Sequence, residues 1–335
     1  MAADPSATAA HRARLCSALA ETQPASEPRF VAVLREGRLL GGAPLVIERR
    51  AGFHWIHSLP FLLPGAPIAV PGARAEVEAA VAGAFANLQR ELRAVGGEWS
   101  LYRYRDEPPG PAATEAVGGQ TRIVETAVVD LEGGLDAAWS RMERKTRQAI
   151  HGARVAGLVF AEEPEALPEA YALYLRQARA WAGHRARPAE LSRRLLARPA
   201  AGARGGDAAA PETPLARLFT VRDGRGLLSA VLALDHPREL MPWWSGTHPD
   251  AHGRRAAVFL LASVVEWAAR EGRAQVNLGG SAGLPALLAF KRALGASTVL
   301  HPVHWLDARY ASPAGRMIAA AQEALRRRRA RGKAA

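Results

Sequence analysis

The chain contains the same hairpin pattern twice, and this repetition limits the folds that it can adopt. The stretches FVAVLREGRLLGGAPLVI and LFTVRDGRGLLSAVLALD each hold an apolar strand, a turn with an acidic residue and a glycine, and a second strand with a small-residue centre. About 190 residues separate them, an offset that is too long for a solenoid and suits two tandem domains. We therefore predict an internal duplication, in which a strand, a long helix and another strand follow each hairpin.

Each half of the chain is expected to be α/β. Hydrophobic periodicity and glycine-bearing turns in the first half predict helices at 6–21 and 74–95 and strands at 29–34, 39–48, 54–58 and 99–103. In the second half they predict helices at 135–156, 164–183, 253–271 and 284–294, and strands at 123–130, 158–161, 241–246, 275–278 and 299–306. A stretch rich in Gly, Ala and Pro predicts a loop at 199–214. The fold class is α/β, with mixed central sheets flanked by helices.

Bulk composition is consistent with a water-soluble globular protein of two domains. The 335 residues are 49% hydrophobic and 23% charged, and the apolar runs are shorter than a membrane-crossing helix needs. The first 20 residues hold no continuous apolar stretch, so we expect no signal peptide. Cys16 is the single cysteine, which excludes an intramolecular disulfide and a thiolate metal cluster. We expect a cytoplasmic location.

The positive charge is concentrated at the C-terminus. The net charge is +12, and about half of it comes from the last ten residues, which hold Arg326, Arg327, Arg328, Arg329, Arg331 and Lys333. Such an arm can attract tRNA, a nucleotide or anionic lipid headgroups, and it can equally be a solvated helix end. No helix-turn-helix or finger pattern is present, so sequence-specific DNA binding is not expected.

The chain lacks the sequence patterns of several enzyme classes. There is no Gly-x-Ser-x-Gly elbow, no Walker-type phosphate loop and no paired-carboxylate signature. His301 and His304 lie three positions apart on an expected strand, so they cannot share a face and are not expected to bind a metal. Hydrolase and NTPase functions are therefore disfavoured.

The second half resembles a known acyltransferase group. The segment WWSGTHPDAHGRRAAVFLLASVVEWAAREGRAQVNLGGSAGLPALLAFKRALGA is similar to the second half of the FemAB-type and BioF2-like branch of the GNAT superfamily. The positions that carry this resemblance are Trp243-Trp244, Gly253, Gly272, Gly279 to Ser281, Phe290-Lys291 and Gly295. The preceding stretch RKTRQAIHGARVAGLVF resembles the basic segment of the same group. The chain departs from the group at Asn277, where an acidic residue is frequent.

The resemblance implies two GNAT-like domains and transfer of an acyl group to an amine. We expect an N-terminal GNAT-like domain at 1–120, a C-terminal acyltransferase domain at 121–312 and a basic helix or tail at 313–335. GNAT folds bind the phosphates of the acyl donor at the N-terminus of a helix, where backbone N–H groups and the helix dipole favour anions. Gly253, Arg254 and Arg255, at the start of an expected helix, fit this role. The alternative is a turn glycine beside solvated arginines.

Lys291 and Ser281 are the candidate catalytic residues. The resemblance places the Phe290-Lys291 pair where donor and acceptor meet, and Lys291 could there neutralise a developing oxyanion or a phosphate. By itself, such a lysine is more often a surface residue whose stem covers apolar atoms. Ser281 could donate a hydrogen bond to an oxyanion, although a serine after two glycines is also a common helix cap.

The remaining candidates are substrate-binding residues. Lys145 and Arg147 form a basic cluster that could hold a phosphate or could be a solvated helix face. Trp243 and Trp244 could line an acyl or sugar pocket, but neighbours on a strand point to opposite faces, so at least one should lie in the core. The resemblance adds two further substrate-binding candidates, Asn277 and Phe290.

We therefore expect an N-acyltransferase that acts on a small molecule or on a sugar or peptide precursor of the cell envelope. The expected donor is acyl-CoA, used as a co-substrate, and no tightly bound cofactor or metal is expected. Two alternatives stay open. One is an aminoacyl-tRNA-dependent transferase of the peptidoglycan-bridging kind, and the other is a catalytically silent GNAT-like binding module. The basic tail could add a weak contact with a membrane surface.

Overall fold

The chain folds into two compact units. The computed structural model describes residues 4, 6–50, 52–59, 63, 65–102, 120–180, 186–198, 213–307 and 317. Unit 1 takes in Met1–His11, Gln23–Val124 and His301–Ala335, and unit 2 takes in Arg12–Thr22 and Glu125–Leu300. Most of the predicted loop at 199–214 and of the predicted tail at 313–335 lies outside the described residues.

Unit 1 is built on a sheet in the strand order β1-β2-β3-β5-β12. Its elements are β1 (Ser26–Arg35), β2 (Arg38–Arg50), β3 (Phe53–His57), β4 (Ile68–Ala69, paired with β2), α2 (Arg74–Glu91), β5 (Gly96–Ser100) and β12 (Ser297–Asp307). The strands β1, β2 and β3 are antiparallel, β5 is parallel to β3, and β12 is antiparallel to β5. The turn between β1 and β2 has positive φ at Glu36 (49°) and Gly37 (77°), a conformation that suits the right-handed twist of a hairpin.

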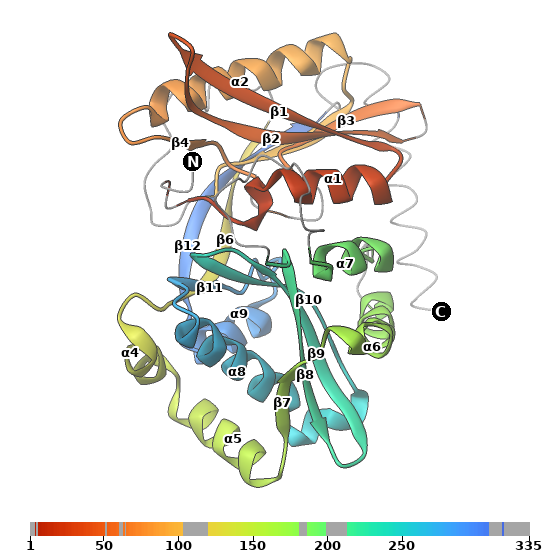
Figure 1. Cartoon of the computed structure of the whole chain (residues 1–335), viewed down its shortest axis with the longest axis vertical. Helices are drawn as coiled ribbons and strands as arrows, with labels where there is room; N and C mark the ends of the chain where they lie inside the picture. The colour runs from red at the N-terminus through yellow and green to blue at the C-terminus, as the bar shows by residue number, and fades with distance from the viewer. Residues whose placement is uncertain are drawn as a thin grey trace. The chain divides into compact units, whose positions relative to one another are not determined.

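Helix α2 covers one face of the unit 1 sheet (Figure 1). Val77, Val81 and Phe85 of α2 are fully buried, and their spacing places them on one side of the helix. Phe85 stacks on Trp99 of β5, with ring centroids 5.9 Å apart. Helix α2 connects β3 to the parallel strand β5, and this apolar layer holds the connection against the sheet.

Unit 2 is built on a sheet in the strand order β6-β11-β10-β9-β8-β7. These strands are β6 (Gln120–Asp130), β7 (Val159–Glu162), β8 (Ala216–Asp223), β9 (Gly226–Asp235), β10 (Glu239–Thr247) and β11 (Gln275–Asn277). The pair β10 and β11 is parallel, and the other neighbours are antiparallel. The parallel pairing joins only Glu239 and Leu240 to Gln275 and Val276. The rest of β10 therefore continues without pairing to β11.

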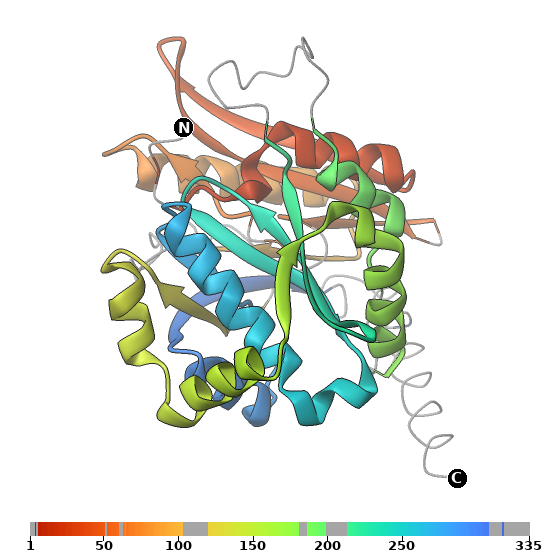
Figure 2. The same ribbon diagram turned by 60° about the horizontal axis from the view of Figure 1, so that its bottom comes forward.

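Helices cover both faces of the unit 2 sheet (Figure 2). On one face α8 (Ala256–Arg270) contacts α4 (Gly134–Arg141) and α5 (Arg144–Val155), and on the other face lie α6 (Leu167–Ala180) and α7 (Ala189–Leu196). Helix α1 (Ala13–Thr22) packs on α7, and α9 (Pro285–Ala293) follows β11. Gly246 lets α6 approach β10, because a Cβ there would lie 2.4 Å from the backbone nitrogen of Tyr174.

The predicted duplication and the α/β fold class are confirmed. The order β1-β2-β3-α2-β5 in unit 1 and the order β8-β9-β10-α8-β11 in unit 2 have the same topology, a three-stranded antiparallel meander followed by a helix and a parallel strand. The units themselves are discontinuous in sequence. The predicted domains at 1–120 and 121–312 are contiguous stretches. In the structure, α1 belongs to unit 2 and the end of β12 belongs to unit 1.

Some predicted elements differ from the structure. The helix predicted at 135–156 is two helices, because Met142 and Glu143 are extended (ψ 142° and 145°) and Met142 is buried in the core. The backbone N–H of Glu143 donates to Ala293 O (3.0 Å) instead of continuing a helix. The helix predicted at 6–21 begins at Ala13, after a 3-10 turn at Ala9–His11, and α7 was not predicted.

None of the helices in the described part of the chain combines the length and the apolar character that crossing a membrane requires.

Candidate functional site

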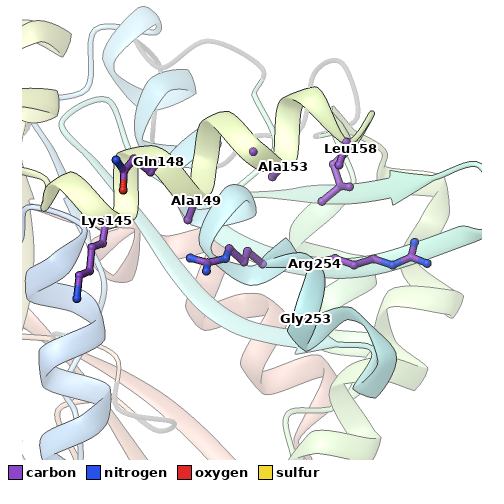
Figure 3. A pocket seen from close by; sticks show the side chains of 10 residues that line it. Lys145, Gln148, Ala149, Ala153, Leu158, Gly253 and Arg254 are labelled. Carbon is purple, nitrogen blue, oxygen red and sulfur yellow. The ribbon is translucent and has the colours of Figure 1, made fainter.

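A pocket of about 580 Å³ lies between α5 and the 3-10 segment η3 (Pro249–Arg254) that leads into α8 (Figure 3). Its residues are Lys145, Gln148, Ala149, Gly152, Ala153 and Ala156 of α5, then Leu158, and finally Gly253, Arg254 and Arg255. The η3 side contributes two arginines, and the α5 side adds Lys145 and Gln148 to a row of small residues. Two stretches that the sequence marked separately, the basic helix and the glycine-arginine loop, meet in this one pocket.

The three cations of the pocket differ in their pairing. Arg254 forms an ion pair with Asp223, at the turn of the β8–β9 hairpin. Lys145 and Arg255 are exposed, and within the described residues neither makes an ion pair or a side-chain hydrogen bond. The pocket thus holds two cationic side chains whose charge the protein does not neutralise, which favours an anionic ligand.

The N-terminus of α8 lies at the same pocket. Its first helical hydrogen bond runs from Phe259 N to Arg255 O (3.0 Å), so the N–H groups of residues 256–258 have no acceptor inside the helix. Arg255 precedes the helix with φ 59°, a left-handed conformation that is uncommon for a residue with a side chain. A Cβ at Gly253 would meet nothing within 4 Å, so this glycine leaves open space in front of the helix end. The helix dipole and the free N–H groups add to the attraction for an anion.

A second constellation surrounds the turn that follows β11. Lys291 of α9 is 6% exposed, and its Nζ donates to the backbone carbonyls of Gly279 and Gly280, each at 2.8 Å. Gly279, Ala282 and Gly283 have φ of 71°, 50° and 72°, so the turn uses three left-handed residues. Lys291 therefore fixes an unusual backbone through two charge-assisted hydrogen bonds.

Burial changes the titration of Lys291. Desolvation lowers the pKa of its ammonium to about 8, and the nearby Glu125 partly opposes this shift. In the same turn the side chain of Ser281 is buried, and its Oγ has no hydrogen-bond partner within the described structure. Buried hydroxyls normally have a partner, so the unpaired Oγ of Ser281 is an exception within the described structure.

Asn277 connects β11 to its neighbours. Its Nδ2 donates to Glu239 Oε2 (3.1 Å), and its Oδ1 accepts from Gly279 N (2.9 Å). Gln275 Nε2 donates to the same carboxylate oxygen (2.7 Å), and Glu239 is 3% exposed. A buried carboxylate, that of Glu239 on the neighbouring strand β10, therefore lies next to Asn277. Sequence reasoning did not single out Glu239, because its pairing with β11 depends on the parallel register.

Four predicted site residues lie elsewhere in unit 2. Arg147 donates to the carbonyl oxygens of Trp139 and Met142 and so caps the end of α4, and it is not among the residues that line the pocket. Trp243 and Trp244 are both buried and do not line the pocket either. Trp244 stacks on Tyr174 of α6, and Phe290 packs against the core next to α8.

The two tryptophans do not behave as the alternation rule predicts. The pairing of β10 with β9 shifts its register between Pro242 and Trp244, which is the signature of a bulge at Trp243. Trp243 packs under the guanidinium of Arg187, whose Cζ lies 5.0 Å from the ring centroid, and Trp244 Nε1 donates to Ser192 Oγ (3.1 Å). Trp244 therefore packs α6 and α7 on the sheet, and Trp243 packs on Arg187, which precedes α7.

Part of the chain matches a known domain family. Residues 139–292 match the model of the acetyltransferase (GNAT) domain. The chain contains a GNAT domain. The pocket, Ser281 and Lys291 all fall inside the matched residues of this domain, and the matched stretch lies wholly within unit 2.

Solved structures show that most of the chain has the fold of FemX. FemX is 13% identical over 90% of this chain and 93% of its own, with a TM-score of 0.65. The C-terminal domain of a protein named as a lysylphosphatidylglycerol synthetase, from Agrobacterium fabrum, is 13% identical over 84% of this chain and 86% of its own (TM-score 0.55). A conserved protein of unknown function from Bacteroides thetaiotaomicron is 9% identical over 91% and 94% (TM-score 0.54). A comparison with curated proteins finds no match.

Proposed function

We propose that the GNAT domain transfers an acyl group from acyl-CoA to an amine of a small molecule or of a cell-envelope precursor. The observation that carries this proposal is the pocket between α5 and η3, where Lys145, Arg255 and the N-terminus of α8 face the same space. The diphosphate and 3′-phosphate of CoA are a concentrated anion, and such a group matches two cations that make no ion pair within the described residues.

The size and the lining of the pocket support a nucleotide-bearing donor. A volume of about 580 Å³ lies within the range of pockets that hold small ligands and cofactors. The wall formed by Ala149, Ala153, Ala156 and Leu158 is apolar, so the pocket offers both a cationic end and a surface for an uncharged group. A buried metal would need a different lining, and in the described residues no three potential metal-binding side chains gather.

In the proposed reaction, the neutral amine attacks the thioester carbonyl and forms a C–N bond. The C–S bond then breaks, the thiolate of CoA takes up a proton, and the amine nitrogen loses one, so that the products are an amide and free CoA. Ser281 is the hydroxyl that we assign to the oxyanion of this step, because its Oγ is buried without a partner in the described structure. Lys291 holds the backbone that carries Ser281, through Gly279 and Gly280.

The test is calorimetric titration of the purified chain with acetyl-CoA. Lys145→Gln and Arg255→Asn are combined in one variant, because asparagine tolerates the left-handed backbone at position 255 and is itself a good N-cap. The control is Arg270→Gln, an exposed arginine at the other end of α8. We expect saturable binding that the double variant weakens by about 10- to 100-fold, the loss of one or two charge-assisted contacts, and that the control leaves unchanged.

Other outcomes would replace the proposal. Absence of binding with acetyl-CoA and with a longer acyl-CoA would exclude the CoA donor and make aminoacyl-tRNA, titrated in the same way, the next donor to test. If neither donor binds, a silent GNAT-like module becomes the better description. If acetyl-CoA binds, release of free CoA in the presence of a panel of primary amines then measures the transfer itself.

A further inference from the structure

Helix α9 exposes an apolar surface where a surface helix normally carries polar residues. Leu284, just before the helix, is 57% exposed, and Leu287 is 37% exposed. The α9 surface is defined by the exposed residues Leu284, Pro285, Ala286, Leu287 and Ala289. Among all residues of α9 the first polar one is Lys291, and its ammonium points inward to Gly279 and Gly280.

A helix of similar length in the same unit shows the ordinary arrangement. Helix α7 turns Leu191 and Leu195 inward, and its outer face carries Glu190, Arg193 and Arg194. These charged side chains form ion pairs with one another along the helix. The exposed surface of α9 is therefore apolar where that of α7 is charged.

Positive charges outnumber negative ones around the α9 surface, where Glu125, beside the Gly280 turn, and Glu143 are acidic neighbours. No Asp or Glu occurs between Leu278 and Leu306, whereas Arg292 is exposed on the last turn of α9. The end of α9 meets the junction of α4 and α5, where Glu143 N donates to Ala293 O (3.0 Å). That junction adds the exposed Arg141 and Arg144 against the single carboxylate of Glu143. An apolar patch with a cationic border is complementary to a surface that is anionic outside and apolar beneath.

We propose that the α9 surface docks on an anionic lipid bilayer. Leu284 and Leu287 enter the headgroup region, and Arg292, with Arg141 and Arg144, faces the lipid phosphates. A protein partner fits less well, because the exposed residues are leucine, proline and alanine, while protein interfaces favour aromatic residues and methionine. Two leucines give a weak, reversible contact, so the anionic lipid is needed for binding. This inference does not depend on the identity of the acyl donor.

The experiment is co-sedimentation of the full chain with vesicles of phosphatidylglycerol and phosphatidylcholine, and with vesicles of phosphatidylcholine alone. The first variant is Leu284→Ser/Leu287→Ser, in which the serine at 284 occupies the N-cap position of α9 and is compatible with the helix. The matched control is Phe30→Ser/Leu34→Ser on β1 in unit 1, where the exposed fractions are 56% and 58%. A third variant lacks residues 326–335 and removes most of the basic tail.

We expect binding to the anionic vesicles only. The partition coefficient should fall about tenfold in the α9 double variant, because two leucines lose their transfer free energy, and it should stay unchanged in the β1 control. Arg292→Gln should lower it about two- to fivefold, consistent with the loss of one interfacial charge.

Three results would overturn the proposal. Binding that the tail deletion abolishes and the leucine substitutions leave intact would assign membrane contact to the tail alone. Equal binding to neutral vesicles, or none to either kind, would remove the lipid as the occupant. A concentration-dependent dimer in light scattering that the α9 double variant abolishes would identify a second copy of the chain as the partner instead.

Discussion

Two regions of unit 2 hold cations that the sequence marks as functional, and the protein uses them differently. In the pocket between α5 and η3, Lys145 and Arg255 are exposed and make no ion pair within the described residues. In the turn after β11, Lys291 is buried and donates to two backbone carbonyls. The first region presents its charge to a ligand, while the second uses its charge to hold the chain.

The difference separates binding from positioning. A cation that already has good partners inside the fold has little to offer a substrate, and its removal leaves buried carbonyls unsatisfied. A cation without partners contributes little to stability and can bind an anion without first breaking a contact. Removing charges in the two regions should therefore affect different measurements, stability in the turn after β11 and ligand affinity in the pocket.

Lys291→Met should lower the free energy of unfolding by about 2–4 kcal/mol, because two buried carbonyl oxygens lose a charged donor. Urea denaturation at neutral pH measures this. Arg292→Met, next in sequence and exposed, is the control and should change stability by less than about 0.5 kcal/mol. Equal, small effects of both substitutions would mean that Lys291 is no more structural than its neighbour.

The lowered pKa of Lys291 should also appear in the pH dependence of the free energy of unfolding. The folded-state pKa is about 8 and the ordinary value is 10.5, so between these pH values the unfolded chain binds a proton that the folded chain has released. The free energy of unfolding of the wild type, relative to that of Lys291→Met, should therefore rise with pH across this window and stay flat below pH 8. Urea denaturation of both proteins from pH 7 to pH 10 tests the sign, and a relative fall would contradict the assigned shift.

Asp223→Asn should raise the affinity for acetyl-CoA about two- to fivefold. The substitution removes the carboxylate that pairs with Arg254, so a third cation of the pocket becomes available. The amide oxygen of asparagine can still accept from the N–H groups of Arg225 and Gly226, which keeps the hairpin turn intact. Calorimetric titration beside the wild type is the measurement. An unchanged or lower affinity would place Arg254 outside the binding region.

Lys145→Gln/Arg255→Asn should leave the free energy of unfolding within about 0.5 kcal/mol of the wild type, since neither side chain makes an ion pair within the described structure. Thermal and urea unfolding of the double variant check this. A loss of more than about 1 kcal/mol would show that the pocket cations support the fold, and the contrast with Lys291 would then disappear.

Local patterns were sufficient to predict much of the fold. The sequence predicted the two hairpins, the helices that follow them and the strands after those helices. Strand alternation, turn glycines and helical periodicity are properties of short stretches. The break between α4 and α5 could not be predicted from the sequence. It arises because Met142 is buried in the core and the backbone of Glu143 bonds to α9, a contact that lies far away in sequence.

The site was predicted in part for the same reason. The order of motifs pointed to Gly253, Arg254, Arg255 and Lys145, which line one pocket. The positions of Arg147, Trp243 and Trp244 depend on which face each side chain takes, and a helix cap and a β-bulge decide that. The partner of Asn277 on β10, Glu239, required the register of two parallel strands, which no single segment encodes.

The most direct test of the central claim is amide hydrogen exchange of the full chain with and without saturating acetyl-CoA. We expect the largest new protection at residues 144–158 and 253–259, the two sides of the pocket, and we expect the Lys145→Gln/Arg255→Asn variant to lose it at the same ligand concentration. Binding of acetyl-CoA without added protection in either segment would contradict the claim that this pocket holds the phosphates of the acyl donor.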